Sequence, residues 1–374
     1  MNAPLVSVVI PTRNAGAALP RLHESLSAQQ VPGGIEIVVI DSASTDGTPR
    51  QARKAGARVL SIPRRRFNHG RTRNQAIEEA RGEFVALTVQ DALPAGERWL
   101  EQLLTPLLEM ADLAGSYGLQ VAPPTAGLLA RARSATWCSE HSQPTIKALA
   151  GPISERTPAE RLELIRFDNV TSFVRRTAWS SWPFPERIYA EDMAWAKTVL
   201  LAGHRLAYVP EARVWHAHER RWLYELRRAY VDGLARAELA DWPSPDLSFY
   251  EAWDLLRHMR NILLTRRFDS VATVERAREI VQQESENAGR LTPSTPTTIR
   301  LKALRFTSDL TTEAAALRGN GCFGGKEWIQ LFRFAVVNAV GTSLGATAFA
   351  ARGEWQQAER ARWNMLHWFL GRGI

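Results

Sequence analysis

Two adjacent carboxylates, Glu191 and Asp192, stand where the loop "FPERIYA" gives way to a segment with helical periodicity. Acidic side chains stabilise the first turn of a helix through the helix dipole, which explains one of the two carboxylates without any function. A carboxylate within hydrogen-bond reach of a hydroxyl can also remove its proton. The pair therefore includes a candidate general base.

A basic segment, residues 50–73, contains nine Lys or Arg and no acid. Such a run is typical of a solvated surface, but its densest part, "RRRFNHGRTR", is interrupted by aromatic, polar and glycine residues, as in a shaped loop. A glycine and the free amides of a helix start, placed beside guanidinium groups, suit a diphosphate. The candidate diphosphate-binding residues of this segment are Asn68, Gly70, Arg71 and Arg73.

A third group of candidates combines one carboxylate with two imidazoles. Asp91 follows the apolar run "FVALTV", and His216 and His218 stand two residues apart in "VWHAHE". On an extended segment, side chains two residues apart point to the same side. A lone histidine or a lone acid at a strand end is more often structural, but a histidine pair beside Trp215 favours contact with a metal or a phosphate.

The elements that must position these side chains are predicted from apolar runs and helical periodicity. Buried strands alternate with helices through the first half of the chain, which predicts an α/β fold with a mostly parallel sheet and right-handed crossovers. From Glu219 onward the periodicity is mainly helical. The expected strands cover residues 6–11, 35–42, 57–63, 84–89, 167–176 and 204–210, and the expected helices cover 17–29, 45–56, 70–82 and 190–203, with a further helix opening at Pro94 and Ala95.

Ligands of such sheets bind beyond the carboxyl ends of the strands, so the residues at these ends are expected to meet at one rim. Asp41 lies at the end of a buried strand, too close to the strand to cap the next helix, so contact with a base or a ribose is its preferred role. For Ser44 and Asp46, a structural role as a helix cap explains the residue as well as a functional role does. Position on the shared rim also favours a functional role for Asp91. The remaining rim residues are Thr12, Arg13, Asn14, Ser42, residues 64–66 and Gln90.

Composition narrows the class of partner. The chain has 374 residues, 45% of them hydrophobic, which allows one large α/β domain with an appendage. The net charge of +8 favours an anionic partner. Basic and acidic residues alternate evenly after the basic segment, which argues against the long basic stripe of a nucleic-acid binder.

Two further features bear on location. We expect a cytoplasmic protein, because no secretory signal precedes the first strand and because Cys138 and Cys322 are too few for a disulfide framework or a zinc site. Residues 334–351 approach the length of a membrane span. They contain Asn338 and three hydroxyl-bearing residues, which favours a buried or interfacial helix.

The order of these motifs resembles that of the family 2 inverting glycosyltransferases, which have the GT-A nucleotide-diphosphosugar transferase fold. The similar stretches include "VSVVIPTRNAG", "IEIVVIDSASTDGT" and "NVTSFVRRTAW", and "FNHGRTRN" and "QDALP" look like the rhamnosyltransferase branch; together they span about residues 5–218. The resemblance implies a GT-A domain with a Rossmann-like sheet over residues 1–218. A mainly helical region, 219–374, would then serve acceptor, membrane-surface or oligomer contacts.

The resemblance also implies roles for particular residues. Asp192 falls at the position of the family's catalytic base, Asp91 at the last position of its metal-binding Asp-x-Asp motif, and His216 at a further metal or diphosphate contact. Val89 occupies the first position of that motif and cannot bind a cation, although the rhamnosyltransferase-like branch often has threonine there. The expected cofactor is Mg²⁺ or Mn²⁺. With the candidates above, the nucleotide-sugar-binding set is Pro11, Thr12, Arg13, Asn14, Asp41, Asn68, Gly70, Arg71, Arg73, Gln90 and Glu191.

The activity implied is that of a hexosyltransferase that moves L-rhamnose from dTDP-L-rhamnose, with inversion, to a lipid-linked or polysaccharide acceptor in bacterial surface glycan synthesis. A UDP- or GDP-sugar donor is an alternative, since no residue identifies the thymine methyl group. A non-catalytic scaffold is another, which Val89 favours and the presence of Asp91 and Asp192 opposes. The tryptophans scattered among arginines after residue 219 fit equally a peripheral contact with the inner membrane and a packed cap or self-association surface.

Overall fold

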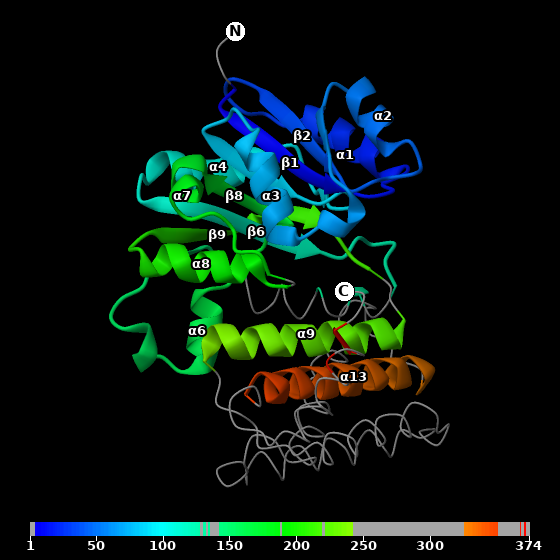
Figure 1. The fold of residues 1–374 in the computed structure, drawn as a ribbon, viewed down its shortest axis with the longest axis vertical. Helices are drawn as coiled ribbons and strands as arrows, with labels where there is room; N and C mark the ends of the chain where they lie inside the picture. The colour runs from blue at the N-terminus through cyan, green and yellow to red at the C-terminus, as the bar shows by residue number, and fades with distance from the viewer. Residues whose placement is uncertain are drawn as a thin grey trace, which may run out of the picture. The chain divides into compact units, whose positions relative to one another are not determined.

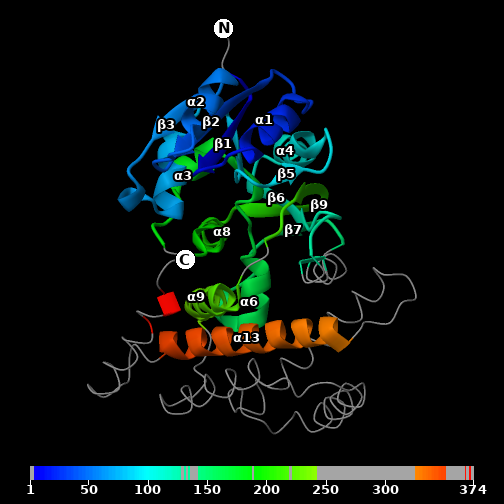
Figure 2. The same cartoon turned by 90° about the vertical axis from the view of Figure 1, so that its right-hand side faces the viewer.

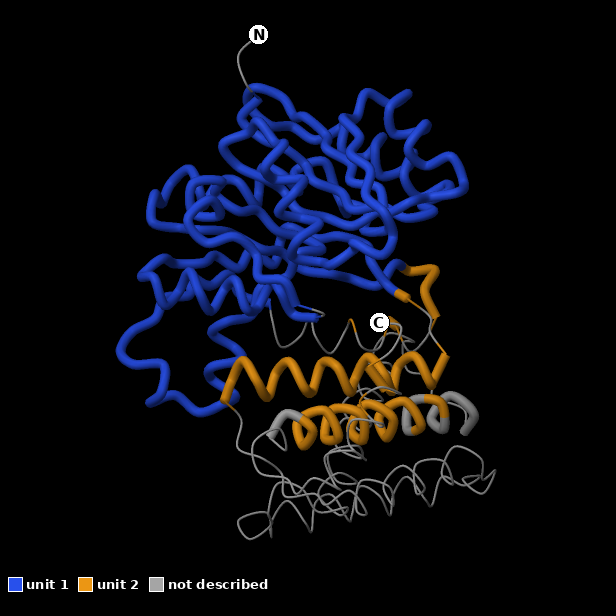
Figure 3. The backbone as a smooth tube through the Cα atoms, viewed as in Figure 1, with its two compact units in different colours: residues 1–123, 138–217 blue, residues 124–137, 218–374 orange. Residues whose placement is uncertain are grey.

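The computed structural model describes residues 4–127, 142–187, 189–218, 221–241 and 325–350, together with residues 130, 131, 134, 367, 370 and 371. The chain divides into two compact units, residues 1–123 with 138–217 and residues 124–137 with 218–374 (Figure 3). The functional division predicted at residue 218 remains a prediction. Both cysteines and most of the C-terminal tryptophans lie outside the described residues.

The first unit begins with four parallel strands in the spatial order β3-β2-β1-β4. These strands and the helices between them follow the alternation expected from the sequence (Figure 1). Most side chains of β1, β2 and β4 are buried, as predicted for a sheet covered on both faces. The elements are β1 Val6–Thr12, α1 Ala18–Ser27, β2 Ile35–Asp41, α2 Thr48–Lys54, β3 Arg58–Ser61, the 3₁₀ helix η1 Arg64–Arg66, α3 His69–Glu78 and β4 Phe84–Thr88.

The other half of the sheet is mixed. β8 (Thr171–Arg175) runs antiparallel to both β4 and β6 (Leu113–Val121), and β6 is parallel to β9 (Arg205–Trp215). β9 also pairs antiparallel with β5 (Leu93–Pro94) and β7 (Thr145–Lys147). The sequence signals predicted β8 and β9 but not β6. Glycines and polar residues interrupt the apolar pattern of β6, so the strand was not predicted, although its first seven residues are buried.

Helices cover both faces of the sheet (Figure 2). Helices α1, α2 and α4 (Trp99–Glu109) share one hydrophobic core with β1 and β2, to which Ile10, Leu22 and Trp99 belong. Helices α3 and α8 (Glu191–Leu201) lie on the opposite face. Further short helices of the first unit are η2 Ile153–Glu155, α6 Pro158–Leu164 and α7 Arg176–Ser181.

The helix predicted to open at Pro94 and Ala95 begins later, so this prediction was wrong. Leu93 and Pro94 form β5, opposite Trp215 and Val214 of β9, and α4 starts at Trp99. The backbone N–H of Ala95 donates to the carbonyl of Arg213 at 2.9 Å, and this interstrand hydrogen bond holds the segment extended where a helix was predicted to begin. Asp91 lies two residues before β5, and the pairing of β5 with β9 brings it toward the end of β9.

In the second unit, α9 (Trp222–Ala240) packs against α13 (Gly325–Ala350). The two helices approach so closely that a Cβ added at Gly345 would lie 1.9 Å from the carbonyl oxygen of Tyr230. Apolar side chains of α13, among them Phe334 and Leu344, are buried. Within the described residues, no helix is long and apolar enough to cross a membrane.

Replacement of Gly345 by Ala should destabilise this helix pair by about 1–3 kcal/mol, because the new methyl group overlaps the backbone of α9. Alanine has the higher helix propensity, so a loss of stability must come from the contact and not from α13 itself. Thermal unfolding and amide exchange over residues 222–240 measure the effect. The control is Gly96→Ala, whose Cβ would meet nothing within 4 Å. Equal stability of both variants would contradict the close packing.

Candidate active site

An interruption in the register of β9 determines where this strand ends. β9 pairs with β6 as far as Tyr208, opposite Tyr117, and pairing resumes only at Arg213, opposite Leu119. Residues 209–212 of β9 are therefore accommodated beside Gly118, where a Cβ would lie 2.0 Å from the carbonyl oxygen of Ala212. Irregularities of this kind redirect a strand and often occur next to active sites.

The redirected end of β9 places His216 beside the carboxyl end of β6. Trp215 is opposite Val121, and the backbone N–H of His216 donates to the carbonyl of Val121 at 2.9 Å. Because Trp215 is also opposite Leu93 of β5, His216 comes close to Asp91. The strand predicted over residues 204–210 thus continues as far as Trp215, the residue before His216.

Asp91 and His216, both predicted as metal ligands, form a carboxylate–imidazole pair in the structure. Oδ1 of Asp91 lies 3.6 Å from Nε2 of His216. His218, the other histidine of the predicted pair, belongs to the second unit. Val89 is an apolar, partly buried side chain packed on the core and supplies no ligand.

The chemistry of these donors fits a divalent cation that prefers oxygen but accepts imidazole. Mn²⁺ meets this description, and Mg²⁺ relies more strongly on oxygen ligands. Asp91 is 41% exposed and His216 is 12% exposed, so a ligand can reach the carboxylate while the imidazole is held by its surroundings. The residues present therefore fit the expected cation, with space for a ligand to supply further oxygens.

Two residues that the sequence analysis did not single out lie behind this pair: Gln120 contacts His216, and Asp168 contacts Gln120. Nδ1 of His216 lies 2.6 Å from Oε1 of Gln120, at the carboxyl end of β6. Nε2 of the same Gln120 amide donates to the carboxylate of Asp168. Gln120 could have been found as another polar residue at a strand end, had β6 been recognised. Asp168 precedes β8, which is antiparallel, so it reaches the rim from the amino end of a strand.

Glu191 forms a buried ion pair at the first residue of α8. Its Oε1 accepts from Nη1 of Arg73 at 2.7 Å and from Nδ2 of Asn169 at 3.2 Å. The Arg73 and Glu191 side chains are 5% and 7% exposed, so neither is open to solvent. Burial disfavours the charged form of Glu191, but Arg73 and His69 outweigh it and hold the pKa of this carboxyl below its ordinary value.

Asp192, the predicted base, has a different environment although it is the next residue. Its carboxylate accepts from the backbone N–H of Asn169 at 3.3 Å and of Met193 at 2.8 Å. Burial, followed by the negative charges of Glu191 and Asp168, raises the pKa of Asp192 to about 8. A carboxyl with its pKa near neutral pH is well suited to accept a proton during a reaction.

The loops after β1, β2 and β4 meet at one rim, as predicted for the ends of parallel strands. Asp41 is buried and accepts from Oγ1 of Thr12 at 3.1 Å and from the backbone N–H of Ser44 at 2.9 Å. The backbone N–H of Asn14 donates to Oγ of Ser44 at 2.8 Å. The Gln90 amide bonds both backbone groups of Arg13, accepting from its N–H at 2.7 Å and donating to its carbonyl at 3.2 Å.

The predicted diphosphate segment is tied to the chain that leads into α8. Asn68 caps α3 by accepting from the backbone N–H of Arg71, and its Nδ2 donates to the carbonyl of Arg187 at 2.9 Å. Gly70 allows close packing, because a Cβ there would lie 2.1 Å from the carbonyl oxygen of Pro185. Arg71 forms an exposed ion pair with Glu186 at 3.1 Å. These contacts hold the start of α8; the ligand-binding roles of Asn68, Gly70, Arg71 and Arg73 remain predictions.

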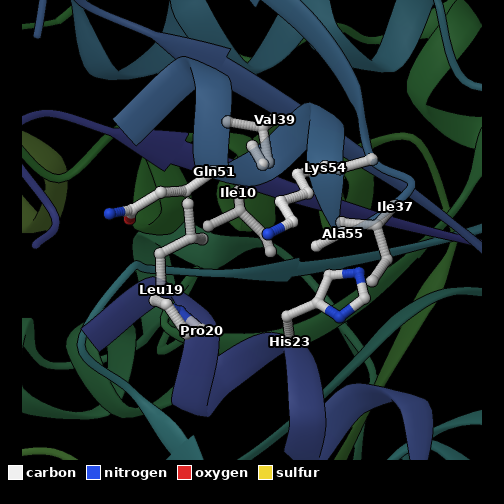
Figure 4. A pocket seen from close by; sticks show the side chains of 11 residues that line it. Ile10, Leu19, Pro20, His23, Ile37, Val39, Gln51, Lys54 and Ala55 are labelled. Atoms are coloured by element: carbon white, nitrogen blue, oxygen red, sulfur yellow. The ribbon is translucent and has the colours of Figure 1, made fainter. Parts of the chain in front are cut away.

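A separate hollow of about 390 Å³ lies between α1, α2 and the sheet (Figure 4). Its lining is mostly apolar, including Ile10, Leu19 and Val39, with Lys54 as its charged side chain. None of the predicted site residues lines it. It offers no carboxylate, and its polar side chains are His23, Gln51 and Lys54, so the candidate site is the rim.

The Arg73–Glu191 pair should be strongly coupled. Either Arg73→Met or Glu191→Gln leaves a buried charge without its partner and should cost about 3–5 kcal/mol of unfolding free energy, whereas the double variant should cost less than the sum. Urea unfolding of the four proteins gives the coupling. Arg71→Met and Glu186→Gln form the matched control, because this exposed pair between the same two regions should contribute about 0–1 kcal/mol. Similar coupling in both pairs would contradict the assigned burial.

The pKa of Asp192 predicts how stability depends on pH. A carboxyl whose folded-state pKa is raised to about 8 contributes stability that is complete below its unfolded value near 3.8 and is lost as the pH rises through about 8. Asp192→Asn lacks this loss. The melting temperature of Asp192→Asn minus that of the natural chain should therefore increase from pH 4 to pH 8.

The control for this titration is Asp112, whose pKa is lowered by a hydrogen bond from Arg205. A lowered pKa contributes stability above the unfolded value and loses it on acidification, so Asp112→Asn should be slightly less stable above pH 5 and should not gain at pH 8. If the melting temperatures of Asp192→Asn and the natural chain changed with pH in the same way across this range, the pKa of Asp192 would not be raised.

Comparison with known proteins shows which family this chain is similar to. Residues 7–118 match the family described as Glycosyl transferase family 2. The O-antigen chain rhamnosyltransferase WbaN of Salmonella anatum is 31% identical over 63% of this chain and 73% of its own length. RfbN of Salmonella typhimurium, described in the same words, is 28% identical over 62% of this chain and 72% of its own length.

Solved structures with a similar arrangement include residues 1–349 of TarS from S. aureus and the mannosyltransferase PcManGT from Pyrobaculum calidifontis in complex with GDP-Man and Mn²⁺. Both have a TM-score of 0.46; TarS is 16% identical and covers 94% of this chain and 93% of its own, and PcManGT is 19% identical and covers 94% and 89%. The chain is an enzyme of glycosyltransferase family 2, with the α/β fold of that family and helices in its C-terminal part.

Proposed function

We propose that this glycosyltransferase moves L-rhamnose from dTDP-L-rhamnose to a lipid-linked or polysaccharide acceptor in the synthesis of a bacterial surface glycan. The donor is supported by two relatives that are named O-antigen chain rhamnosyltransferases and match over more than two thirds of their length. The reaction would take place in the cytoplasm. The observation that carries the assignment of the site is the half-buried carboxyl of Asp192, with its pKa raised to about 8, at the start of α8.

In the proposed reaction, an acceptor hydroxyl attacks the anomeric carbon of the donor sugar. The new bond to the acceptor oxygen forms as the bond from the anomeric carbon to the diphosphate oxygen breaks, and the nucleoside diphosphate leaves with that electron pair. Asp192 takes the hydroxyl proton as the nucleophile develops. One displacement at the anomeric carbon inverts its configuration.

The charge of the leaving diphosphate has to be neutralised. Asp91 and His216 would hold Mg²⁺ or Mn²⁺, which as a Lewis acid supplies positive charge to the diphosphate oxygens. Asp41 and the residues from Pro11 to Asn14 would hold the nucleotide at the adjoining ends of β1 and β2. Their mutual hydrogen bonds fix this loop before a ligand binds, which lowers the entropy lost on binding.

Turnover of dTDP-L-rhamnose by the full chain, with Mn²⁺ and surface-glycan acceptors, tests the proposal. Asp192→Asn should lower turnover by about 10²–10⁴-fold because the general base is lost. The same variant should still be stabilised by dTDP, by about 2.7 kcal/mol at a hundred times the dissociation constant. Asp112→Asn, remote from the rim, is the matched control for activity.

The alternatives give different results in the same experiments. Stabilisation by UDP or GDP but not by dTDP would replace rhamnose with another donor sugar. Full turnover by Asp192→Asn would remove Asp192 as the base. The absence of both transfer and donor hydrolysis with every nucleotide sugar would support a non-catalytic scaffold and overturn the proposal.

A further inference from the structure

The side chain of Gln120 lies between His216 and Asp168 and bonds to both. We infer that Gln120 and Asp168 are positioning residues, which lock the His216 imidazole so that its Nε2 lone pair is presented beside Asp91 to a divalent cation. The inference rests on the proposed function, because it concerns the cation assigned there to Asp91 and His216. It adds two residues for which the family motifs in the sequence gave no role.

The lock follows from which atoms can donate. An ionised carboxylate such as that of Asp168 can only accept hydrogen bonds, so the end of the Gln120 amide that faces it must be the NH₂ group. The amide oxygen must then face His216, where it lies 2.6 Å from Nδ1. Two acceptors cannot bond each other, so Nδ1 carries the hydrogen. In a neutral imidazole, Nε2 is therefore the acceptor.

The atom left as acceptor is the one that faces the second ligand. Nε2 of His216 lies 3.6 Å from Oδ1 of Asp91. A lone pair and a carboxylate oxygen that face each other at this distance repel, and a cation that bonds both replaces the repulsion with attraction. Outer partners that fix the tautomer and orientation of a histidine ligand typically change metal affinity by about 10–100-fold when they are removed.

Asp168 itself is held by the turn that precedes β8. Its Oδ1 accepts from the backbone N–H of Val170 at 3.0 Å, and its carbonyl accepts from the N–H of Thr171 at 3.2 Å. The next residue, Asn169, bonds both Glu191 and Asp192. One short turn therefore supports the proposed cation ligand through the Asp168 side chain and the proposed base through the backbone N–H of Asn169.

Three variants separate this role from simple packing. Gln120→Met keeps the length of the side chain but removes both hydrogen bonds. Asp168→Asn leaves Gln120 opposite an amide, so that Gln120 can turn over and His216 can change tautomer. The double variant Gln120→Glu with Asp168→Asn restores the lock, because the carboxylate introduced at position 120 can only accept from His216 while the new amide at position 168 donates to it.

The experiment measures Mn²⁺ binding to the full chain by electron paramagnetic resonance, with and without dTDP, and the tautomer of His216 by ¹⁵N chemical shifts in the metal-free protein. Gln120→Met should weaken Mn²⁺ binding by about 10–100-fold and should lose the Nδ1–H signature. Asp168→Asn should weaken it in the same direction. The double variant should recover the tautomer and bind Mn²⁺ within a few-fold of the natural chain.

Asp91→Asn shows whether the measured Mn²⁺ occupies this site, since it removes a ligand charge and should abolish tight binding. Unchanged Mn²⁺ affinity in Gln120→Met, or a folded double variant that fails to recover the affinity, would overturn the positioning role while the proposed sugar transfer still stands. If the natural chain binds no Mn²⁺ with or without dTDP but transfers rhamnose, the cation and this inference both fail. If transfer alone fails while the Mn²⁺ pattern holds, the proposed function fails and the positioning role stands.

Discussion

The site depends on the pairing of the end of β9 with β5 and β6. Trp215 is opposite both Leu93 and Val121, so three segments distant in sequence are joined by backbone hydrogen bonds at one point. Backbone pairing fixes Asp91, Gln120 and His216 within reach of one another whatever their side chains are. The register break at residues 209–212 sets the phase of this pairing, and without it His216 would not end beside β6.

Electrostatics then gives two neighbouring carboxyls opposite properties. Glu191 is buried against Arg73 and keeps its charge, whereas Asp192 has burial and two negative neighbours and resists ionisation. Arg73 also lowers the pKa of Asp192, but burial and the charges of Glu191 and Asp168 outweigh it. Adjacent acids with pKa values driven apart by their surroundings are a familiar arrangement in enzymes that transfer protons. A single dipeptide thus provides a fixed anchor and a titrating group.

The sequence predicted what local patterns determine. Apolar runs and helical periodicity located β1 to β4 and the helices between them, and the strand ends placed Asp41 and Asp91 at the rim. Such local patterns do not indicate which strands pair over long distances in the sequence, so β5 was assigned to a helix and β6 was missed. Asp168 and Asn169 were overlooked for the same reason: they stand before an antiparallel strand, whose amino end shares the rim with the carboxyl ends of β4 and β6. The burial of Arg73 with Glu191 also required the tertiary structure.

Ala190, which precedes the two carboxyls, has a left-handed backbone with a φ of 57°. For a residue with a Cβ this conformation costs roughly 1–2 kcal/mol, and no capping side chain compensates it. Glycine would adopt it more easily but would also leave the preceding loop more freedom before the helix begins. Alanine at this position lowers the stability of the fold but restricts the backbone before the helix. The direction of the Asp192 carboxyl is therefore set before substrates bind, and less conformational entropy is lost when they do.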